Sequence, residues 1–204
     1  MNPDEVRRAW AERSGEFSPA YYAHYGPDDT SESIRRHVER FVDRDDAVLE
    51  VGCSSGRHLA HLADHGFENL TGVEVNGDAF DVLAETYPEL AAAGTFYRAA
   101  IEDVVGEFAD DQFAAVYSVE TLQHLHPDAS WVFGELARIT GELLVTVENE
   151  GRAGPGADDV NYIDGEFPLY YRDWNSVFTE RGFREVASAT LDRDTLRAFR
   201  PTGT

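Results

Sequence analysis

The sequence predicts an α/β fold in which helices cover both faces of a mostly parallel sheet. Residues 48–76 read as a buried strand, a turn rich in glycine and serine, a helix and a second strand, which together make a βαβ unit. Further apolar strand segments alternate with segments of helical periodicity, as they do in parallel sheets. Residues 183–190 and 195–200 read as two strands with a short connection, so we expect the sheet to end in an antiparallel hairpin.

The N-terminal segment, residues 1–43, is expected to form a helical cap outside the sheet. Its first part is rich in aromatic side chains, and Ile34, Val38 and Phe41 recur at helical spacing over residues 30–41. The chain has 204 residues, which suits one domain with an adequate core, and no linker or internal repeat divides it. We therefore expect residues 1–204 to form a single domain.

The remaining elements follow in order along the chain. Leu59 and Leu62 lie on one face of the first helix of the βαβ unit, and Gly66 and Gly182 are natural helix stops. The predicted strands are 47–51, 70–75, 95–100, 111–118, 142–148, 183–190 and 195–200, and two further helices are predicted at 128–139 and 172–181.

The turn Gly52-Cys53-Ser54-Ser55-Gly56 has the composition of a ligand-binding loop. Glycine accepts positive φ and lets the backbone approach a ligand closely. Glu74 lies near the carboxyl end of the second strand, where ligands bind in open α/β sheets. A carboxylate there can accept hydrogen bonds from both hydroxyls of a ribose. The dinucleotide fingerprint G-x-G-x-x-G is not met, because its second and third glycines are missing.

This segment resembles motif I of the class I S-adenosylmethionine-dependent methyltransferases, acidic-x-Gly-x-Gly-x-Gly. Glu50, Gly52 and Gly56 match the motif, and Ser54 replaces its middle glycine. Residues 95–103 are similar to the family's third strand and the loop that follows it. Residues 111–125 are similar to its FDxVxS strand and Leu-x-His-Leu pattern, so the resemblance covers about residues 45–150. It implies a Rossmann-like fold with a seven-stranded sheet in the order 3-2-1-4-5-7-6.

The resemblance also implies the cofactor, S-adenosyl-L-methionine, with S-adenosyl-L-homocysteine as the product. In the family, residues after the third strand flank the adenine, and Ile101 and Glu102 match them. Arg57, at the start of the motif helix, is placed to meet the methionine carboxylate. The expected cofactor-binding residues are Glu50, Gly52, Cys53, Ser54, Gly56, Arg57, Glu74, Val75, Ile101, Glu102, Ser118 and Tyr22.

Catalysis would mainly require alignment of an acceptor with the methyl–sulfur bond, and a general base where the acceptor carries a proton. His124 matches the family's histidine after the fourth strand, and Glu120 lies on the same segment. In many members that histidine is structural, so both readings stay open. Residues 149–171 are expected to be a substrate-side insertion or else a surface excursion. Weaker candidates for the base are Glu148, Tyr21 and His24, and Tyr22 or Tyr25 is expected to close over the cofactor.

Composition limits the setting in which the protein works. The net charge is −22, and all 17 basic residues are arginine, which indicates a halophilic host with a salty cytoplasm. This acidity disfavours nucleic acid as a partner. The first residues of the chain lack the basic and apolar regions of a signal peptide, and no apolar run is long enough to span a bilayer, so we expect a cytoplasmic location. Cys53 is the only cysteine, and because we find no cysteine–histidine cluster with metal-ligand spacing, we expect no metal.

Three classes of function remain open at this point. The first is a methyltransferase that acts on a small molecule by in-line displacement, which compactness and acidity favour. The second is a methyltransferase that acts on protein or tRNA, for which an exposed groove beside the cofactor would be expected. The third is a regulator that binds the cofactor without catalysis. The oligomeric state also stays open, with a homodimer as one alternative.

Overall fold

The structure is a computed structural model that describes residues 1–151, 160–163 and 167–203. Its strands are β1 (Val48–Val51), β2 (Leu70–Glu74), β3 (Thr95–Arg98), β4 (Phe113–Val119), β5 (Thr140–Glu148), β6 (Val160–Ile163), β7 (Phe167–Tyr170), β8 (Phe183–Thr190) and β9 (Thr195–Pro201). Its α-helices are α1 (Pro3–Ala11), α2 (Pro19–Tyr25), α3 (Asp29–Phe41), α4 (Arg57–Asp64), α5 (Asp78–Thr86), α6 (Pro88–Ala93), α7 (Ile101–Val104), α8 (Val132–Ile139) and α9 (Trp174–Thr179).

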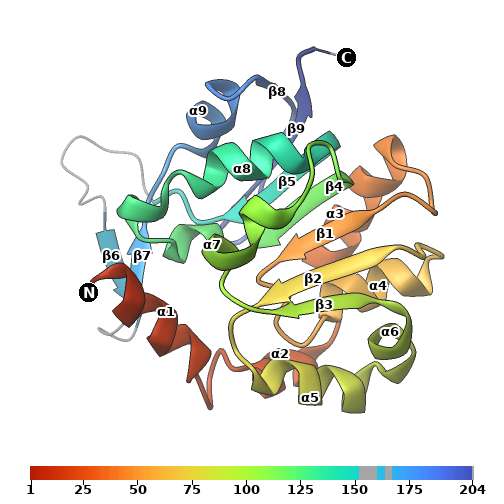
Figure 1. The fold of residues 1–204 in the computed structure, drawn as a ribbon, viewed down its shortest axis with the longest axis vertical. Coiled ribbons are helices and arrows are strands. Elements are labelled where there is room, and N and C mark those ends of the chain that lie inside the picture. The colour runs from red at the N-terminus through yellow and green to blue at the C-terminus, as the bar shows by residue number, and fades with distance from the viewer. Residues whose placement is uncertain (152–159, 164–166, 204) are drawn as a thin grey trace.

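A single large sheet organises the fold, with the strand order β3-β2-β1-β4-β5-β9-β8 (Figure 1). Strands β1 to β5 pair in parallel, whereas β9 runs antiparallel to both β5 and β8. Strands β6 and β7 pair only with each other, in a separate two-stranded sheet. Counted within the large sheet, β8 and β9 are therefore its sixth and seventh strands. The strand order is therefore the expected 3-2-1-4-5-7-6, and only the strand numbers differ. The predicted α/β class is confirmed.

Buried apolar side chains fill the space between the sheet and its helices on both faces. On one face, Phe133 of α8 and Trp174 of α9 belong to a cluster that also contains residues of α7. On the other face, Ile34 of α3, Leu59 of α4 and Leu83 of α5 belong to a second cluster. These helices keep the sheet away from water on both sides, as a parallel sheet requires.

Several predicted boundaries are wrong, and local hydrogen bonding explains them. The helix predicted at 128–139 begins only at Val132, because a separate 3₁₀ turn occupies Pro127–Ala129. The helix predicted at 172–181 begins at Trp174, since the Asp173 carboxylate caps it by accepting the Ser176 N–H at 3.1 Å. Two helices that were not predicted, α5 and α6, fill residues 78–93.

The predicted insertion at 149–171 is in part regular. Strands β6 and β7 pair antiparallel within it, and all four residues of β7 are buried. Residues 152–159 and 164–166 of this insertion lie outside the described residues. Figure 1 shows the β6–β7 sheet and α1 together on the side toward which the parallel strands point. Helix α1 and this small sheet therefore flank the carboxyl edge of the large sheet.

In the described part of the chain, no helix has both the length and the apolar character needed to cross a bilayer.

Candidate active site

A cavity lies at the carboxyl edge of the sheet, beyond β1, β2 and β4. Its volume of about 170 Å³ is more than ten times the ~10–15 Å³ that one water molecule requires, so it can hold a ligand of many atoms. The sheet edge contributes residues 50–54, 73–76, 99–102 and 119–121, and the N-terminal segment contributes side chains between residues 3 and 22. The cavity therefore lies where the sequence analysis expected a ligand.

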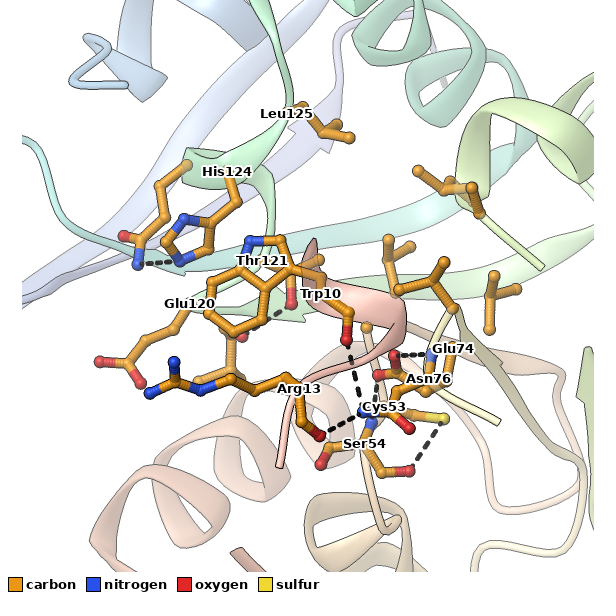
Figure 2. Close-up of a pocket in the computed structure, with 18 of the residues that line it drawn as sticks. Trp10, Arg13, Cys53, Ser54, Glu74, Asn76, Glu120, Thr121, His124 and Leu125 are labelled. Carbon is orange, nitrogen blue, oxygen red and sulfur yellow. Dashed lines mark hydrogen bonds between the residues drawn. The ribbon is translucent and has the colours of Figure 1, made fainter. Parts of the chain in front are cut away.

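The turn after β1 is built from left-handed residues and is tied to the turn after β2. Gly52, Ser54 and Gly56 have φ values of 72°, 47° and 78°. The Ser54 N–H donates to Glu74 Oε2 at 2.9 Å, and the Asn76 N–H donates to Glu74 Oε1 at 2.7 Å (Figure 2). Burial raises the pKa of Glu74, and the two N–H groups oppose that shift. Each Glu74 oxygen keeps further acceptor capacity for a ligand.

The two motif glycines have different neighbours. A Cβ on Gly52 would lie 2.1 Å from Thr121 Oγ1, so the missing side chain lets the segment after β4 approach the turn. A Cβ on Gly56 would lie 2.3 Å from Leu83 Cδ1, and Gly56 does not line the described cavity. Gly56 therefore packs against α5, and its contact with the cofactor stays a prediction.

Cys53 lines the cavity but its thiol is buried against the sheet. A Cβ on Gly72 of β2 would lie 2.6 Å from Cys53 Sγ, so the sulfur occupies the space above that glycine. Burial raises the pKa of the Cys53 thiol well above its usual range. The side chain is therefore a neutral packing group at the edge of the cavity.

Glu50 and Arg57 both line the cavity, each with a partner of its own. Glu50 is fully buried and accepts the Tyr117 hydroxyl at 3.1 Å; burial raises its pKa well above the usual range despite this bond. Arg57 donates to Asp28 Oδ2 at 2.8 Å, and its guanidinium lies 5.0 Å from the ring centre of Tyr22. Arg57 thus ties α4 to the cap of α3, and a ligand carboxylate would share it with Asp28.

A narrow, largely apolar part of the cavity lies after β3. Val75, Ala100 and Ile101 line it, with Glu102 at its polar end. Burial raises the pKa of Glu102, and the nearby charge of Arg7 opposes the shift. The predicted residues Val75, Ile101 and Glu102 are thus brought together with Glu74.

His124 lines the opposite wall and is held in one tautomer. Its Nδ1 lies 2.9 Å from the carbonyl oxygen of Pro168, which can only accept, so Nδ1 carries the proton. Its Nε2 then offers a lone pair, 3.3 Å from the Gln123 amide nitrogen. Burial lowers the pKa of His124 to about 4, although the bond to Pro168 acts the other way. His124 is therefore a neutral imidazole at neutral pH, and the Trp10 ring packs against it with centroids 4.5 Å apart.

Glu120 also lines the cavity, at the end of β4. Its φ of 48° is unusual for a residue with a side chain. Its carboxylate accepts from Arg193, in the turn between β8 and β9, at 2.5 Å. The neighbouring Asp194 is largely buried, which raises the pKa of its carboxyl to about 8, and the Glu120 charge adds to the shift. Glu120 thus lines the cavity with its carboxylate paired to Arg193.

Ser118 and Glu148 form a buried pair behind the wall and do not line the described cavity. The Ser118 hydroxyl donates to Glu148 Oε1 at 2.7 Å, and the N–H groups of Thr121, Leu122 and Gln123 also donate to the Glu148 carboxylate. The Ser118 hydroxyl faces Glu148, and its contact with the cofactor stays a prediction. Glu148, a weaker candidate for the base, instead organises the backbone that carries His124.

Arg172 holds the same segment through its carbonyl groups. Its guanidinium donates to the Leu122 carbonyl at 3.2 Å and to the Leu125 carbonyl at 2.6 Å. Burial lowers the pKa of Arg172 to about 10, and the charge of Glu148 opposes this shift. The irregular backbone at 121–125 is therefore bound by a carboxylate at its N–H groups and by a guanidinium at its carbonyls.

The N-terminal segment is fastened over the cavity by Asn76. The Asn76 side-chain amide donates to the Trp10 carbonyl at 3.3 Å and to the Arg13 carbonyl at 3.0 Å (Figure 2). Phe167 of β7 packs against the Trp10 ring, and the Arg13 guanidinium lies 4.5 Å from the centre of the Phe167 ring. The expected cap is therefore in contact with both the sheet edge and the insertion.

Sequence reasoning missed Trp10, Arg13, Asn76 and Arg193, all of which line the cavity. Asn76 follows Glu74 by two residues, a spacing that could have identified it. The others come from distant segments, and no local pattern marks them. Tyr22 lines the cavity as expected, whereas Tyr21, His24 and Tyr25 do not line it in the described structure.

Comparison with known proteins agrees with this geometry. Residues 48–142 match the family model described as a methyltransferase domain, a segment that contains the turn after β1, Glu74 and His124. An O-methyltransferase of Pyrenophora dematioidea is 25% identical over 92 residues, which are 45% of this chain and 34% of that protein. The chain spans about a third of the length of the curated relatives it matches, between 28% and 42%.

Solved structures share the fold over most of the chain. The 1,6-didemethyltoxoflavin-N1-methyltransferase of Burkholderia thailandensis, with bound 1,6-didemethyltoxoflavin and S-adenosylhomocysteine, has a TM-score of 0.67 at 17% identity, covering 84% of this chain and 76% of that one. The [4+2]-cyclase SpnF has a TM-score of 0.69 at 13% identity, covering 95% of this chain and 86% of that one. The fold is therefore the Rossmann-like fold of class I methyltransferases, and residues 48–142 match a methyltransferase domain model. Because a cyclase shares it, the fold alone leaves the reaction open.

Proposed function

We propose that the protein is an S-adenosylmethionine-dependent methyltransferase that acts on a small-molecule acceptor. The observation that carries this proposal is the Glu74 carboxylate at the carboxyl end of β2. Its two oxygens are oriented by the Ser54 and Asn76 N–H groups, and it lines a cavity that continues toward Ile101 and Glu102. A carboxylate beside the apolar residues Val75, Ala100 and Ile101 suits a ribose joined to an adenine.

The residues present fit this cofactor, which the cavity would hold along the sheet edge. Glu74 would accept the ribose hydroxyls, and Ile101 and Glu102 would flank the adenine. Glu50, Gly52, Cys53, Ser54 and Val75 would shape the floor, and Arg57 and Tyr22 would meet the methionine end. S-adenosyl-L-homocysteine would be the product. Gly56 and Ser118, which were also expected to bind the cofactor, pack against Leu83 and Glu148 in this structure and would support the arrangement from behind the lining residues.

The chemistry asked of the chain is modest. The cofactor supplies a methyl group on a sulfonium, which is already activated toward a nucleophile. His124 Nε2 accepts a hydrogen bond from the Gln123 amide, so an acceptor hydroxyl or amine would have to displace that amide before the imidazole takes its proton. Glu120 is held by Arg193 and would orient the acceptor or serve as the alternative base. The walls formed by Trp10 and Tyr22 would keep water out while the acceptor is aligned.

The cover over the cavity favours a small acceptor over a macromolecule. Asn76 fixes the N-terminal segment across the sheet edge, and Trp10 contacts Phe167 of the insertion with ring centres 4.8 Å apart. A protein or tRNA substrate would need an open groove in this place. Acceptor groups of limited size would reach His124 without displacing these contacts.

We further propose that residues 1–204 form one domain with residues 1–43 as its cap and 149–171 at its substrate side. Its net charge of −22 and lack of lysine suit the cytoplasm of a halophile and oppose binding to nucleic acid. A homodimer is compatible with the exposed aromatic Tyr25, which would pack against a second subunit.

Titration calorimetry with S-adenosylmethionine, S-adenosylhomocysteine and NAD, in about 1 M KCl to screen surface charge, tests the proposal. We expect the first two to bind and NAD not to bind. Release of S-adenosylhomocysteine from mixtures of small hydroxyl and amine compounds then tests transfer. Binding of NAD alone, or no binding to a folded sample, contradicts the proposed cofactor. Binding without transfer to any compound would favour the regulator instead.

Glu74→Ala is expected to weaken binding of S-adenosylhomocysteine by more than about tenfold, because the ribose hydroxyls lose their acceptor. Calorimetry at equal protein concentration measures the change. Glu85→Ala, an exposed carboxylate on α5, is the matched control and should bind as the parent does. Circular dichroism must show that the Glu74 variant is folded, since Ser54 and Asn76 also lose their acceptor. A folded variant with unchanged affinity would remove Glu74 from the cofactor site.

A further inference from the structure

A cluster of three metal-ligating side chains lies away from the cavity, on the outer side of α3 and α4. It consists of Glu32 of α3 and of His61 and His65 of α4, and one ligand atom of each lies within 4.8 Å of the other two. The side chain of Glu32 is 31% exposed and that of His61 is 18% exposed, so an ion could enter from solvent. Neither the expected cofactor nor the acceptor makes use of these residues.

The fold brings the three groups together for simple reasons. His61 and His65 are four residues apart, and such residues lie one above the other on the same face of a helix. His65 follows Asp64, the last residue of α4, as its cap. Helix α3 packs on α4, which places Glu32 beside His61 with His61 Nε2 at 3.1 Å from Glu32 Oε2.

The hydrogen bonds of His65 prepare it as a ligand. Its Nδ1 lies 2.7 Å from the carbonyl oxygen of His61, which can only accept, so Nδ1 carries the proton. Nε2 of His65 therefore presents a lone pair. Histidines that bind metals usually donate their other ring N–H to a carbonyl or a carboxylate in this way.

Glu32 is held in place by two guanidinium groups. Arg35 donates to both of its oxygens at 2.8 and 2.9 Å, and Arg36 donates to Oε1 at 2.9 Å. These arginines fix the carboxylate and also place positive charge near it, which weakens the attraction for a cation. Glu39 pairs with Arg35 and offsets part of that charge. We therefore expect a site of moderate affinity, with water completing the ion's coordination.

We propose that Glu32, His61 and His65 bind one divalent transition-metal ion of the Zn²⁺ type. Two imidazoles and one carboxylate suit Zn²⁺, whereas Mg²⁺ and Ca²⁺ prefer oxygen ligands only. On binding, the proton that His61 Nε2 donates to Glu32 is replaced by one on Nδ1, exchanged through solvent, and Nε2 coordinates the ion as a neutral imidazole. The ion links α3 to α4 and stabilises the folded state increasingly as its concentration rises above the dissociation constant.

No metal was expected from the sequence, because it contains no cysteine–histidine cluster with metal-ligand spacing. The feature of the sequence that could have indicated this site is the spacing of His61 and His65, which are four residues apart on α4 and its C-cap. The third ligand comes from another helix 29 residues earlier, and no spacing rule connects it to them.

The test is titration of the full chain, free of any histidine tag, with ZnCl₂ in about 1 M salt, where the Debye length is roughly 3 Å. We expect one ion per chain, a dissociation constant on the order of micromolar and a rise in melting temperature. Absorbance of the Co²⁺ form reports imidazole coordination. MgCl₂ at the same concentration is expected to produce neither effect.

His61→Ala and His65→Ala are each expected to weaken Zn²⁺ binding by more than about tenfold, and Glu32→Gln by less. His37→Ala is the matched control, since His37 also lies on α3 and bonds to the carbonyl of its own helix. Equal binding by all variants would place the ion on the acidic surface and overturn the proposal. No binding by the folded parent would overturn it as well. None of these results depends on methyl transfer, so the two proposals fail separately.

Discussion

Ser54 occupies a backbone conformation that favours glycine, with a φ of 47°. A residue with a side chain destabilises the folded state by roughly 1–2 kcal/mol when it adopts this conformation. Glycine avoids that strain, but its greater entropy in the unfolded chain cancels part of the gain. Ser54→Gly is therefore expected to raise the free energy of unfolding by roughly 0.5–1 kcal/mol. Denaturant unfolding measures it. Ser54→Ala keeps the strain and should give no gain; a Gly variant no more stable than the parent would mean that the turn is not strained.

His124 is buried as a neutral imidazole, and this makes it a determinant of acid stability. Its folded pKa of about 4 lies below the ordinary value of 6.5, so its contribution is present above pH 6.5 and is lost as pH falls toward 4. The parent should lose stability relative to His124→Asn in this window, with a slope approaching about 1.4 kcal/mol per pH unit. Asparagine can still donate to the Pro168 carbonyl.

Unfolding of both proteins between pH 4 and 8 measures the difference. A constant difference across this range would mean that His124 is accessible and titrates normally. His124→Asn should also reduce turnover while leaving the affinity for S-adenosylhomocysteine unchanged, because the histidine lies across the cavity from Glu74. Equal turnover would leave His124 with a structural role only.

At the scale of the residue, sequence reasoning found the groups that local pattern defines. Glu74 was predictable because it ends a strand of the βαβ unit, and its position at the cavity agrees. Asn76 and Trp10 were not predictable as a pair, since the contact joins residues 66 positions apart. Gly56 and Ser118 belong to the motifs but pack against Leu83 and Glu148. A motif states which residue types recur at each position, and it does not state which atoms they contact.

The segment after β4 contains only a short 3₁₀ turn, Leu122–His124, and the charged residues Glu148 and Arg172 define its path. The Glu148 carboxylate accepts four hydrogen bonds, three of them from the N–H groups of residues 121–123. Burial nevertheless raises its pKa to about 7. Its folded pKa thus exceeds the ordinary value of 4.5, so its contribution to stability is full below pH 4.5 and is lost as pH rises through about 7. This sign is opposite to that of His124.

Glu148→Gln is expected to remove this pH dependence, so the parent should lose stability relative to the variant between pH 4.5 and about 7. The glutamine has one acceptor oxygen, and its NH₂ faces a backbone donor. Amide exchange at residues 121–123 should therefore speed up by about tenfold or more, measured by hydrogen exchange. Glu150→Gln, whose carboxylate pairs with Arg197, is the control and should leave these amides unchanged. Unaltered protection in Glu148→Gln would mean that Glu148 does not hold the segment.

Among whole elements, regular periodicity was predicted well and irregular structure was not. The large-sheet strands were found because apolar runs bounded by turns are local signals. The start of α8 was misplaced, since Pro127 favours a 3₁₀ turn that the apolar pattern does not reveal. Strands β6 and β7 pair with each other, and Phe167 of β7 packs against Trp10. The formation of these strands therefore depends on a contact with a residue that is distant in sequence.

At the scale of the whole molecule, charge is the least balanced property. The chain carries 39 acidic residues against 17 arginines. Salt screens two opposed interactions: the repulsion among excess carboxylates, and the attraction within surface ion pairs such as Arg36–Glu32 and Arg138–Asp110. Exposed pairs contribute only about 0–1 kcal/mol each. Repulsion among the 22 uncompensated charges acts over the entire surface, and we expect it to decide the sign.

The melting temperature should therefore rise as KCl increases from about 0.1 M to about 1 M, over which the Debye length falls from ~10 Å to ~3 Å. If screening removes about 2 kcal/mol of self-repulsion, the rise is roughly 4–8 °C for a chain of this size. Calorimetry in KCl and NaCl measures it, and the two salts should agree because screening depends on ionic strength. A melting temperature that falls with salt would show that ion pairs dominate, and the halophilic interpretation of the composition would then be wrong.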